Sequence, residues 1–278
     1  MQGIVSSKVL GIIGLDYSGS TLLTNILSGL PDTVNTGESH WIIDRNLGCK
    51  ECGNQPCPIY TQEMMNELRE LSIPTTEWWN VIASHSNSKL IISSDKRPRH
   101  YDRLGHPNHV ILLIKDPRAN ITSWCSRKFN DAKREDEFFT NEQVERGLVW
   151  WYKLHKEAID WLEENEIPTT VLFLEDFVSN QRERLSSIAE IFSMSLNDEQ
   201  KTNALQFWER QLHYIGGNHS VKRLDKNRYF YKSIKIDERW KNRLSDESQH
   251  EILVDRRVSI VNKRIQQFRI LGPDISQK

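Results

Sequence analysis

The chain has 278 residues, of which 37% are hydrophobic and 27% are charged. This composition supports a packed core and is usual for a single α/β domain with insertions. Lys and Arg number 37 and Asp and Glu number 38, so the net charge of −1 excludes a chain-wide field for nucleic acid or an anionic membrane. Any anion site must therefore be local.

The sequence shows no signal-peptide pattern and no apolar run of about 18 residues, so we expect no membrane span. Three of the four cysteines lie within nine residues, at Cys49, Cys52 and Cys57, and Cys125 stands apart. Cysteines this few and this clustered do not make a disulfide scaffold. We therefore expect a cytoplasmic protein, because thiols stay reduced in the cytoplasm.

The first elements form an anion-binding pattern. An apolar strand over 9–13 leads through the glycine-rich stretch 14–19 into an apolar helix that ends near Leu27. In such a turn, backbone N–H groups and the helix dipole converge on a ligand. Ser20 and Thr21 follow the second glycine, whereas an ATP-binding loop places Lys there. The stretch predicts a phosphate-type loop that does not suit ATP.

Hydrophobic periodicity predicts the remaining elements. They are a loop over 29–46, a cysteine-containing insertion over 48–60, helices over 61–71 and 77–85, a strand over 89–94, a basic turn over 95–99, a strand over 109–114, helices over 119–128 and 141–165, a strand over 169–174, helices over 181–193 and 198–211, a loop over 215–232, and one or two helices over 245–268. Alternating strands and helices predict an α/β fold, with a P-loop-type parallel sheet and helices on both faces. We expect one domain over residues 1–278, with an inserted loop and helical region at about 29–86.

The predicted strands end in charged clusters. In parallel sheets of this class, ligands bind at the carboxyl ends of the strands. The first strand ends in the glycine loop, and the others end in Asp95-Lys96-Arg97, Lys115-Asp116-Pro117-Arg118 and Glu175-Asp176. The polarity of loops does not explain three basic or phosphate-type sites at one edge. A ligand with two separated phosphate groups accounts for them better.

Residues 110–124, VILLIKDPRANITSW, resemble the 3′-phosphate-binding segment of sulfotransferases that use 3′-phosphoadenosine 5′-phosphosulfate (PAPS). Other segments resemble this family in the family's order: the 5′-phosphosulfate loop at 14–23, a Glu-Asp signature at 174–178, a late Gly-Asn loop at 216–223 and the segment at 236–245. GESHW and the cysteines up to CPIY resemble a bacterial-type branch with Cys-x-x-Cys-Gly and Cys-Pro signatures. The resemblance implies transfer of a sulfuryl group from PAPS to an acceptor hydroxyl, with 3′-phosphoadenosine 5′-phosphate (PAP) as product and no metal required.

The resemblance also implies the nucleotide contacts. The loop would present N–H and hydroxyl donors to the 5′-phosphosulfate, and the segment after the third predicted strand would hold the 3′-phosphate. Ser123 and Arg127 share one helix face because they are four residues apart. The expected cofactor-binding residues are Tyr17, Ser18, Gly19, Ser20, Thr21, Leu22, Lys115, Ser123, Arg127, Gly217, Asn218 and Lys222.

Three residues are candidates for catalysis. An acceptor hydroxyl must lose a proton as it attacks sulfur, and the carboxylate of Glu38 is the expected general base. His40, two residues further on, is the competing base. Lys96 would lie near the bridging oxygen, where negative charge develops on the leaving group.

The chain departs from the family pattern at two positions. Tyr17 stands where the family has Arg or Lys, so Lys96 or Arg97 must supply the missing cation. Lys115 stands in place of the 3′-phosphate Arg and would pair with phosphate as a point charge.

Several alternatives stay open. The cysteine cluster with His40 forms a zinc site, an unliganded thiol cluster or a redox-dependent disulfide. A P-loop kinase is a rival function, although position 20 is not Lys, and the change at Tyr17 favours a non-catalytic nucleotide-binding protein. We expect no nucleic-acid partner. The acceptor is open among small-molecule, lipid, glycan and peptide hydroxyls.

Overall fold

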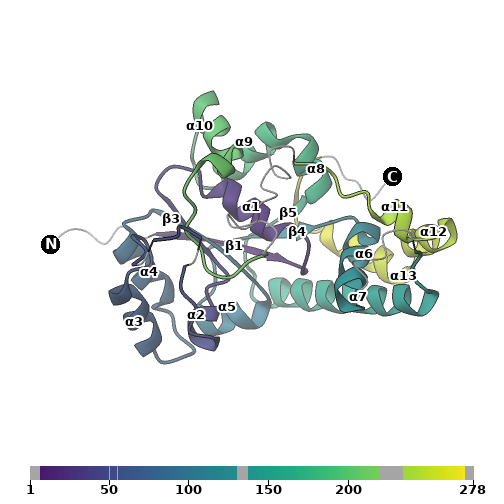
Figure 1. Cartoon of the computed structure of the whole chain (residues 1–278), viewed down its shortest axis with the longest axis horizontal. Coiled ribbons are helices and arrows are strands. Elements are labelled where there is room, and N and C mark those ends of the chain that lie inside the picture. The colour runs from purple at the N-terminus through teal and green to yellow at the C-terminus, as the bar shows by residue number, and fades with distance from the viewer. Residues whose placement is uncertain (1–6, 50, 55, 130–136, 219–233, 273–278) are drawn as a thin grey trace. The chain divides into compact units, whose positions relative to one another are not determined.

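The computed structural model describes residues 7–49, 51–54, 56–129, 137–218 and 234–272. The strands of this part of the chain form one parallel sheet in the order β2-β3-β1-β4-β5-β6, flanked by helices (Figure 1). They are β1 (Lys8–Gly14), β2 (Thr33–Gly37), β3 (Leu90–Lys96), β4 (His109–Ile114), β5 (Thr169–Phe173) and β6 (Arg269–Leu271). The predicted α/β fold with a parallel sheet is confirmed.

Continuous burial explains why β1 and β4 read as unbroken apolar runs. Val9 of β1 pairs with Ile91 of β3, and Ile91 also pairs with Val34 of β2. In β4, every residue from Val110 to Ile114 is buried. A strand buried along its whole length is typical of a parallel sheet that helices cover on both faces.

Contacts between residues divide the chain into two compact units. Unit 1 comprises residues 1–13, 20–111 and 180–234, and unit 2 comprises residues 14–19, 112–179 and 235–278. Unit 1 therefore contains β2, β3 and most of β1, whereas unit 2 contains β5, β6 and the second half of β4.

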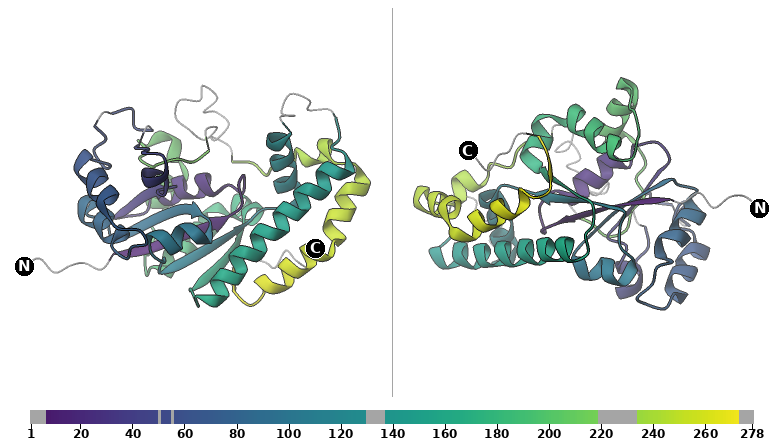
Figure 2. Two further views of the ribbon diagram at one scale, coloured as in Figure 1. Left: turned by 90° about the horizontal axis from the view of Figure 1, so that it is seen from below. Right: turned by 180° about the vertical axis from the view of Figure 1, so that it is seen from behind.

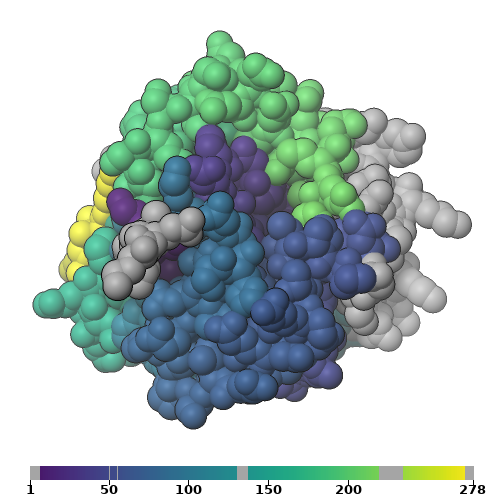
Figure 3. All heavy atoms as spheres, turned by 90° about the vertical axis from the view of Figure 1, so that its left-hand side faces the viewer, coloured from purple at the N-terminus to yellow at the C-terminus, as the bar shows by residue number. Residues whose placement is uncertain are grey.

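In unit 1, helices lie on two sides of the strands. One side has α1 (Ser20–Leu27), α9 (Gln181–Ile191) and α10 (Asp198–Leu205), and the other has α3 (Gln62–Glu70) and α4 (Trp78–Ser86) (Figure 1). The α3–α4 pair, drawn in blue, forms much of the surface in Figure 3. The short helices are α2 (Trp41–Asp44), α5 (Pro98–Leu104) and the 3-10 helix η1 (Phe207–Glu209). The indole N–H of the buried Trp78 donates to the Ser39 hydroxyl at 3.2 Å, which ties α4 to the loop after β2.

Unit 2 is organised around the long helix α7 (Asn141–Glu164). A capping box begins it, in which Thr140 and Gln143 each accept a hydrogen bond from the other's backbone N–H. Both α6 (Pro117–Lys128) and α13 (Arg256–Ile265) pack on α7, and α13 runs alongside it in Figure 2. The other helices are α8 (Leu174–Ser179), α11 (Trp240–Arg243) and α12 (Asp246–Val254). Among the described residues, no helix has both the length and the apolar character of a membrane span.

The sequence does not predict β2, β6 or α5. β2 lies within the loop expected over 29–46. Its polar side chains can be buried in a strand because they form hydrogen bonds inside the protein. The Thr36 hydroxyl donates to the carbonyl of Ile92 at 3.1 Å, and the Asn35 amide donates to Asn25 at 3.1 Å. α5 begins at Pro98, inside the basic turn expected over 95–99, and proline is suited to the first helical position.

Gly37, the last residue of β2, is in close contact with Ile215. Its φ is +61°, and a Cβ atom there would lie 2.3 Å from the carbonyl oxygen of Ile215. We expect Gly37→Ala to lower the free energy of unfolding by about 2 kcal/mol or more, because it adds a steric overlap to left-handed backbone strain. Urea denaturation of the full chain measures this difference.

Gly48→Ala is the matched control, because among the described residues beyond its two chain neighbours no atom lies within 4 Å of the Cβ position at Gly48. This change should alter the free energy of unfolding by about 0.5 kcal/mol or less. Equal destabilisation by the two substitutions would contradict the close approach at Gly37.

Candidate functional site

The glycine-rich loop, residues 14–19, belongs to unit 2 and is tightly packed. A Cβ at Gly14 would lie 2.8 Å from the Ser18 hydroxyl, and Gly19 has a φ of +90°. The Ser18 side chain is buried, and its oxygen has no hydrogen-bond partner among the described residues. A buried hydroxyl without a partner is rare in a folded protein and is typical of a group that awaits a ligand or water.

Lys115, which follows β4, is the centre of polar contacts in unit 2. Its side chain is 5% exposed, so its ammonium group is largely removed from water. It donates to the carbonyl of Tyr17 at 3.4 Å and to the Ser123 hydroxyl at 3.3 Å. These contacts link the glycine loop to α6. Two residues that the sequence assigns to one phosphate therefore lie together.

A carboxylate from the C-terminal region is bound to these same donors. Asp237 Oδ2 lies 2.7 Å from Lys115 Nζ, 2.7 Å from an Arg239 guanidinium nitrogen and 3.4 Å from Ser123 Oγ. Burial alone would raise the pKa of Asp237, but Arg239 and Lys115 hold it well below the ordinary value. The donors that are expected to bind a phosphate thus already bind the Asp237 carboxylate.

Tyr17 has a cationic neighbour in the same unit. The Arg127 side chain, which is exposed at the end of α6, lies close enough to the Tyr17 hydroxyl to lower its pKa. Burial and the nearby Asp16 raise the pKa of Tyr17, and Arg127 offsets part of this effect. The structure thus brings a third expected nucleotide contact, Arg127, to the loop position that lacks the family's Arg or Lys.

Hydrogen bonds fix the turn between β4 and α6. Asp116 accepts from the backbone N–H groups of Arg118 and Ala119 and so caps α6. Its own N–H donates to Glu175 Oε1 at 3.1 Å. The Arg118 guanidinium pairs with Asp116 and stacks on Trp240. These contacts give Glu175 and Arg118 structural roles around Lys115.

In unit 1, Glu38 and Lys96 form an ion pair. Lys96 Nζ donates to Glu38 Oε1, and the Trp41 indole N–H donates to Glu38 Oε2 at 2.9 Å. The side chains of Glu38 and Lys96 are 12% and 15% exposed, so both stay accessible. Lys96 has a φ of +61°, a strained backbone conformation for a residue with a side chain. Two of the three expected catalytic side chains are therefore in direct contact.

The third expected catalytic residue, His40, belongs to a buried network. Its Nδ1 lies 2.6 Å from Asp95 Oδ1, and its ring stacks on His100. Burial would raise the pKa of Asp95, but hydrogen bonds from His40 and Ser93 outweigh it and lower the pKa. The open alternative of a zinc site that joins His40 to the cysteine cluster is wrong, because His40 lies in a separate group with Asp95 and His213 is the histidine beside the cysteines.

The remaining expected contacts in unit 1 surround the start of α1. Ser20 and Thr21 are buried and Leu22 is half-buried in its first turn. The backbone N–H of Asn218 donates to the Thr21 hydroxyl at 3.1 Å, and a Cβ at Gly217 would lie 3.1 Å from the Thr21 methyl group. Lys222 lies outside the described residues. The start of the late Gly-Asn loop therefore contacts α1.

Comparison of the chain with known proteins gives information on its fold. No known protein-family profile matches the chain, and no curated protein sequence matches it. Its structure is similar to that of mouse sulfotransferase SULT7A1 complexed with PAP, with a TM-score of 0.51 over 95% of this chain and 88% of the mouse chain. The chain has a sulfotransferase-type fold. Sequence identity is 12%, so the likeness extends to the fold and the residue roles stay predictions.

Sequence reasoning missed three residues around these groups: Asp237, Arg239 and His213. Asp237 is 122 residues from Lys115, and His213 is 156 residues from Cys57. No local spacing connects residues this far apart in the chain. The one available signal for Asp237 and Arg239 is that both lie in the segment 236–245, which resembles the sulfotransferase family.

Removal of the Asp237 carboxylate should strengthen anion binding at Lys115. In Asp237→Asn the ammonium group loses its internal counter-charge, so a phosphate no longer competes with a carboxylate. We expect the affinity for PAP to rise by about tenfold, the scale of one charge-assisted hydrogen bond. Isothermal titration calorimetry of the full chain measures this change.

Glu238→Gln is the matched control, since Glu238 is the next residue and its exposed carboxylate pairs with Lys241. Its affinity for PAP should equal that of the unchanged chain. An unchanged or weaker affinity in Asp237→Asn would show that this carboxylate does not compete with the ligand.

Proposed function

We propose that the chain is a PAPS-dependent sulfotransferase of the bacterial-type branch that transfers a sulfuryl group to an acceptor hydroxyl by in-line attack. The observation that carries the proposal is the set of donors around the Asp237 carboxylate in unit 2, which consists of the buried Lys115 and Ser123 and the exposed Arg239. The likeness to a sulfotransferase fold with bound PAP supports the same ligand class. The acceptor is a small-molecule, glycan or peptide hydroxyl.

The 3′-phosphate would be bound by Lys115, Ser123 and Arg127. On binding, the phosphate would replace the Asp237 carboxylate as the partner of the Lys115 ammonium group. The loop residues Tyr17 to Gly19 and the start of α1 would donate to the 5′-phosphosulfate. The buried, unpartnered Ser18 hydroxyl fits such a ligand, because an anionic oxygen would supply its missing partner. Gly217, Asn218 and Lys222 would complete the nucleotide contacts.

When bound, PAPS supplies the activated sulfuryl group. The Glu38 carboxylate accepts the proton of the acceptor hydroxyl as that hydroxyl attacks sulfur. The Lys96 ammonium group donates to the oxygen on which negative charge develops. Their ion pair holds the two side chains together before the reaction, and Trp41 fixes the orientation of the carboxylate. The proposal assigns no metal to this transfer.

Calorimetry with PAP and ATP tests the proposed ligand. The full chain should bind PAP without Mg²⁺ and should not bind ATP with or without Mg²⁺. Lys115→Ala should weaken PAP binding by at least about tenfold, since it removes a charged donor. Lys128→Ala, an exposed change on the same helix as Ser123, should leave it unaltered. Tight ATP–Mg²⁺ binding without PAP binding would contradict the proposal in favour of a kinase.

Turnover with radiolabelled PAPS and a panel of hydroxyl acceptors tests the catalytic roles. Glu38→Gln and Lys96→Ala should each lower kcat by about 10²- to 10⁴-fold, the usual range for proton transfer and charge stabilisation. Glu70→Gln, an exposed change on α3, is the control for Glu38. Affinity for PAP should stay within about twofold in Glu38→Gln and Glu70→Gln, whereas Lys96→Ala should also weaken it, because PAP keeps the oxygen to which Lys96 donates. Unchanged turnover in Glu38→Gln and Lys96→Ala would contradict the mechanism.

A further inference from the structure

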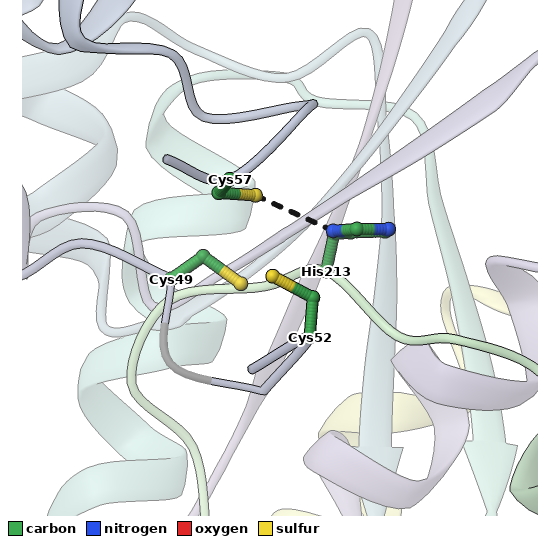
Figure 4. Close-up of side chains that lie close together, drawn as sticks. All are labelled: Cys49, Cys52, Cys57 and His213. Carbon is green, nitrogen blue, oxygen red and sulfur yellow. Dashed lines mark hydrogen bonds between the residues drawn. The ribbon is translucent and has the colours of Figure 1, made fainter. Parts of the chain in front are cut away.

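Four metal-ligating side chains of unit 1 converge outside the site described above. Cys49, Cys52 and Cys57 come from the insertion before α3, and His213 comes from the segment after η1 (Figure 4). One ligand atom from each lies within 4.8 Å of the others. Cys57 Sγ is 3.3 Å from His213 Nδ1. The side chains point toward a common centre, as Figure 4 shows.

The spacing fits a tetrahedral metal ion. Zinc bound by thiolates and imidazole, at about 2.3 Å to sulfur and about 2.0 Å to nitrogen, holds its ligand atoms about 3.5 to 3.8 Å apart. The observed cluster needs an adjustment of about 1 Å at most to reach this geometry. None of the three cysteines forms a disulfide, and all three are buried.

The backbone around the cysteines is arranged for thiolate ligands. Gly53 has a φ of +70°, which turns the chain so that the N–H of Asn54 faces Cys52 Sγ at 3.4 Å. The N–H of Tyr60 likewise donates to Cys57 Sγ at 3.3 Å. Such N–H donors partly neutralise the negative charge of metal-bound sulfur and orient it, as the outer shell of a metal site does.

We propose that Cys49, Cys52, Cys57 and His213 bind one zinc ion in a closed structural site. Thiolate and imidazole ligands in a tetrahedral arrangement favour zinc over magnesium or calcium, which prefer oxygen. Four protein ligands leave no position for water or substrate, so the ion has a structural role and no catalytic one. The inference does not rest on the proposed function.

The zinc ion would hold together two segments that are distant in the sequence. The Gln211 amide donates to the carbonyl of Cys52 at 3.0 Å, which gives a second link beside His213. Two residues after His213, Ile215 pairs with Gly37, and its carbonyl accepts from the N–H of Glu38 at 2.7 Å. The metal thereby fixes the segment that supports the backbone of Glu38.

Metal analysis of the full chain, purified with a thiol reductant, tests this site. Elemental mass spectrometry should find about one zinc ion per chain. After exchange with Co²⁺, the spectrum should show a sulfur-to-cobalt charge-transfer band and the intense visible bands of tetrahedral cobalt. A strong chelator should lower the Tm, because the metal stabilises the folded chain.

Variants separate ligation from simple destabilisation. His213→Ala should lose at least about tenfold in zinc affinity, measured by competition with a chromophoric chelator. His213→Cys should restore the zinc content with a four-sulfur site. Cys125→Ala is the control, since Cys125 is a buried free thiol on α6 outside the cluster, and it should keep full zinc content.

Three results would overturn the proposal. They are a metal-free chain with no thiolate bands on cobalt titration, iron in place of zinc, or a disulfide within the cluster in the freshly purified chain. Loss of zinc in Cys125→Ala to the same extent as in His213→Ala would also count against it. None of these results bears on PAP binding, so the site and the proposed function fail independently.

Discussion

The buried ammonium group of Lys115 is the constraint around which the polar structure of unit 2 is arranged. A charge removed from water must be paired and hydrogen-bonded, or it destabilises the fold. Lys115 meets this need through the carbonyl of Tyr17, the Ser123 hydroxyl and the Asp237 carboxylate. The loop after β1, the helix α6 and the segment before α11 are therefore held by one cation. The proposed function assigns the 3′-phosphate to this same cation.

In unit 1, the buried carboxylate of Asp95 organises the polar contacts in a comparable way. Asp95 accepts hydrogen bonds from the Ser39 and Ser93 hydroxyls and from the backbone N–H of His40. These bonds fix the end of β3 and the loop after β2, the two places that carry Lys96 and Glu38. His40 is thus better described as a residue that positions this loop than as an exposed base, because Asp95 binds its ring.

Local patterns predicted most of the fold and part of the site. The apolar run of β4, the long helix α7 and the glycine loop each depend on neighbouring residues, and a single sequence shows these. β2 was not predicted, because its polar residues Asn35 and Thr36 do not form an apolar run. In the folded chain their side chains are buried by hydrogen bonds to residues elsewhere in the sequence. The roles of His213 and Asp237 were not predicted for a related reason. Only folding brings His213 to Cys57 and Asp237 to Lys115.

Two residues, Tyr17 in unit 2 and Lys96 in unit 1, have left-handed backbone conformations, with φ values of 65° and 61°. Each costs on the order of 1 kcal/mol or more relative to glycine, which adopts this conformation without strain. At these positions local stability and side-chain chemistry are in opposition, the relation known as a stability–activity trade-off. A screen for more stable variants would therefore tend to replace the aromatic ring and the ammonium group, the two side-chain groups that the proposed function requires.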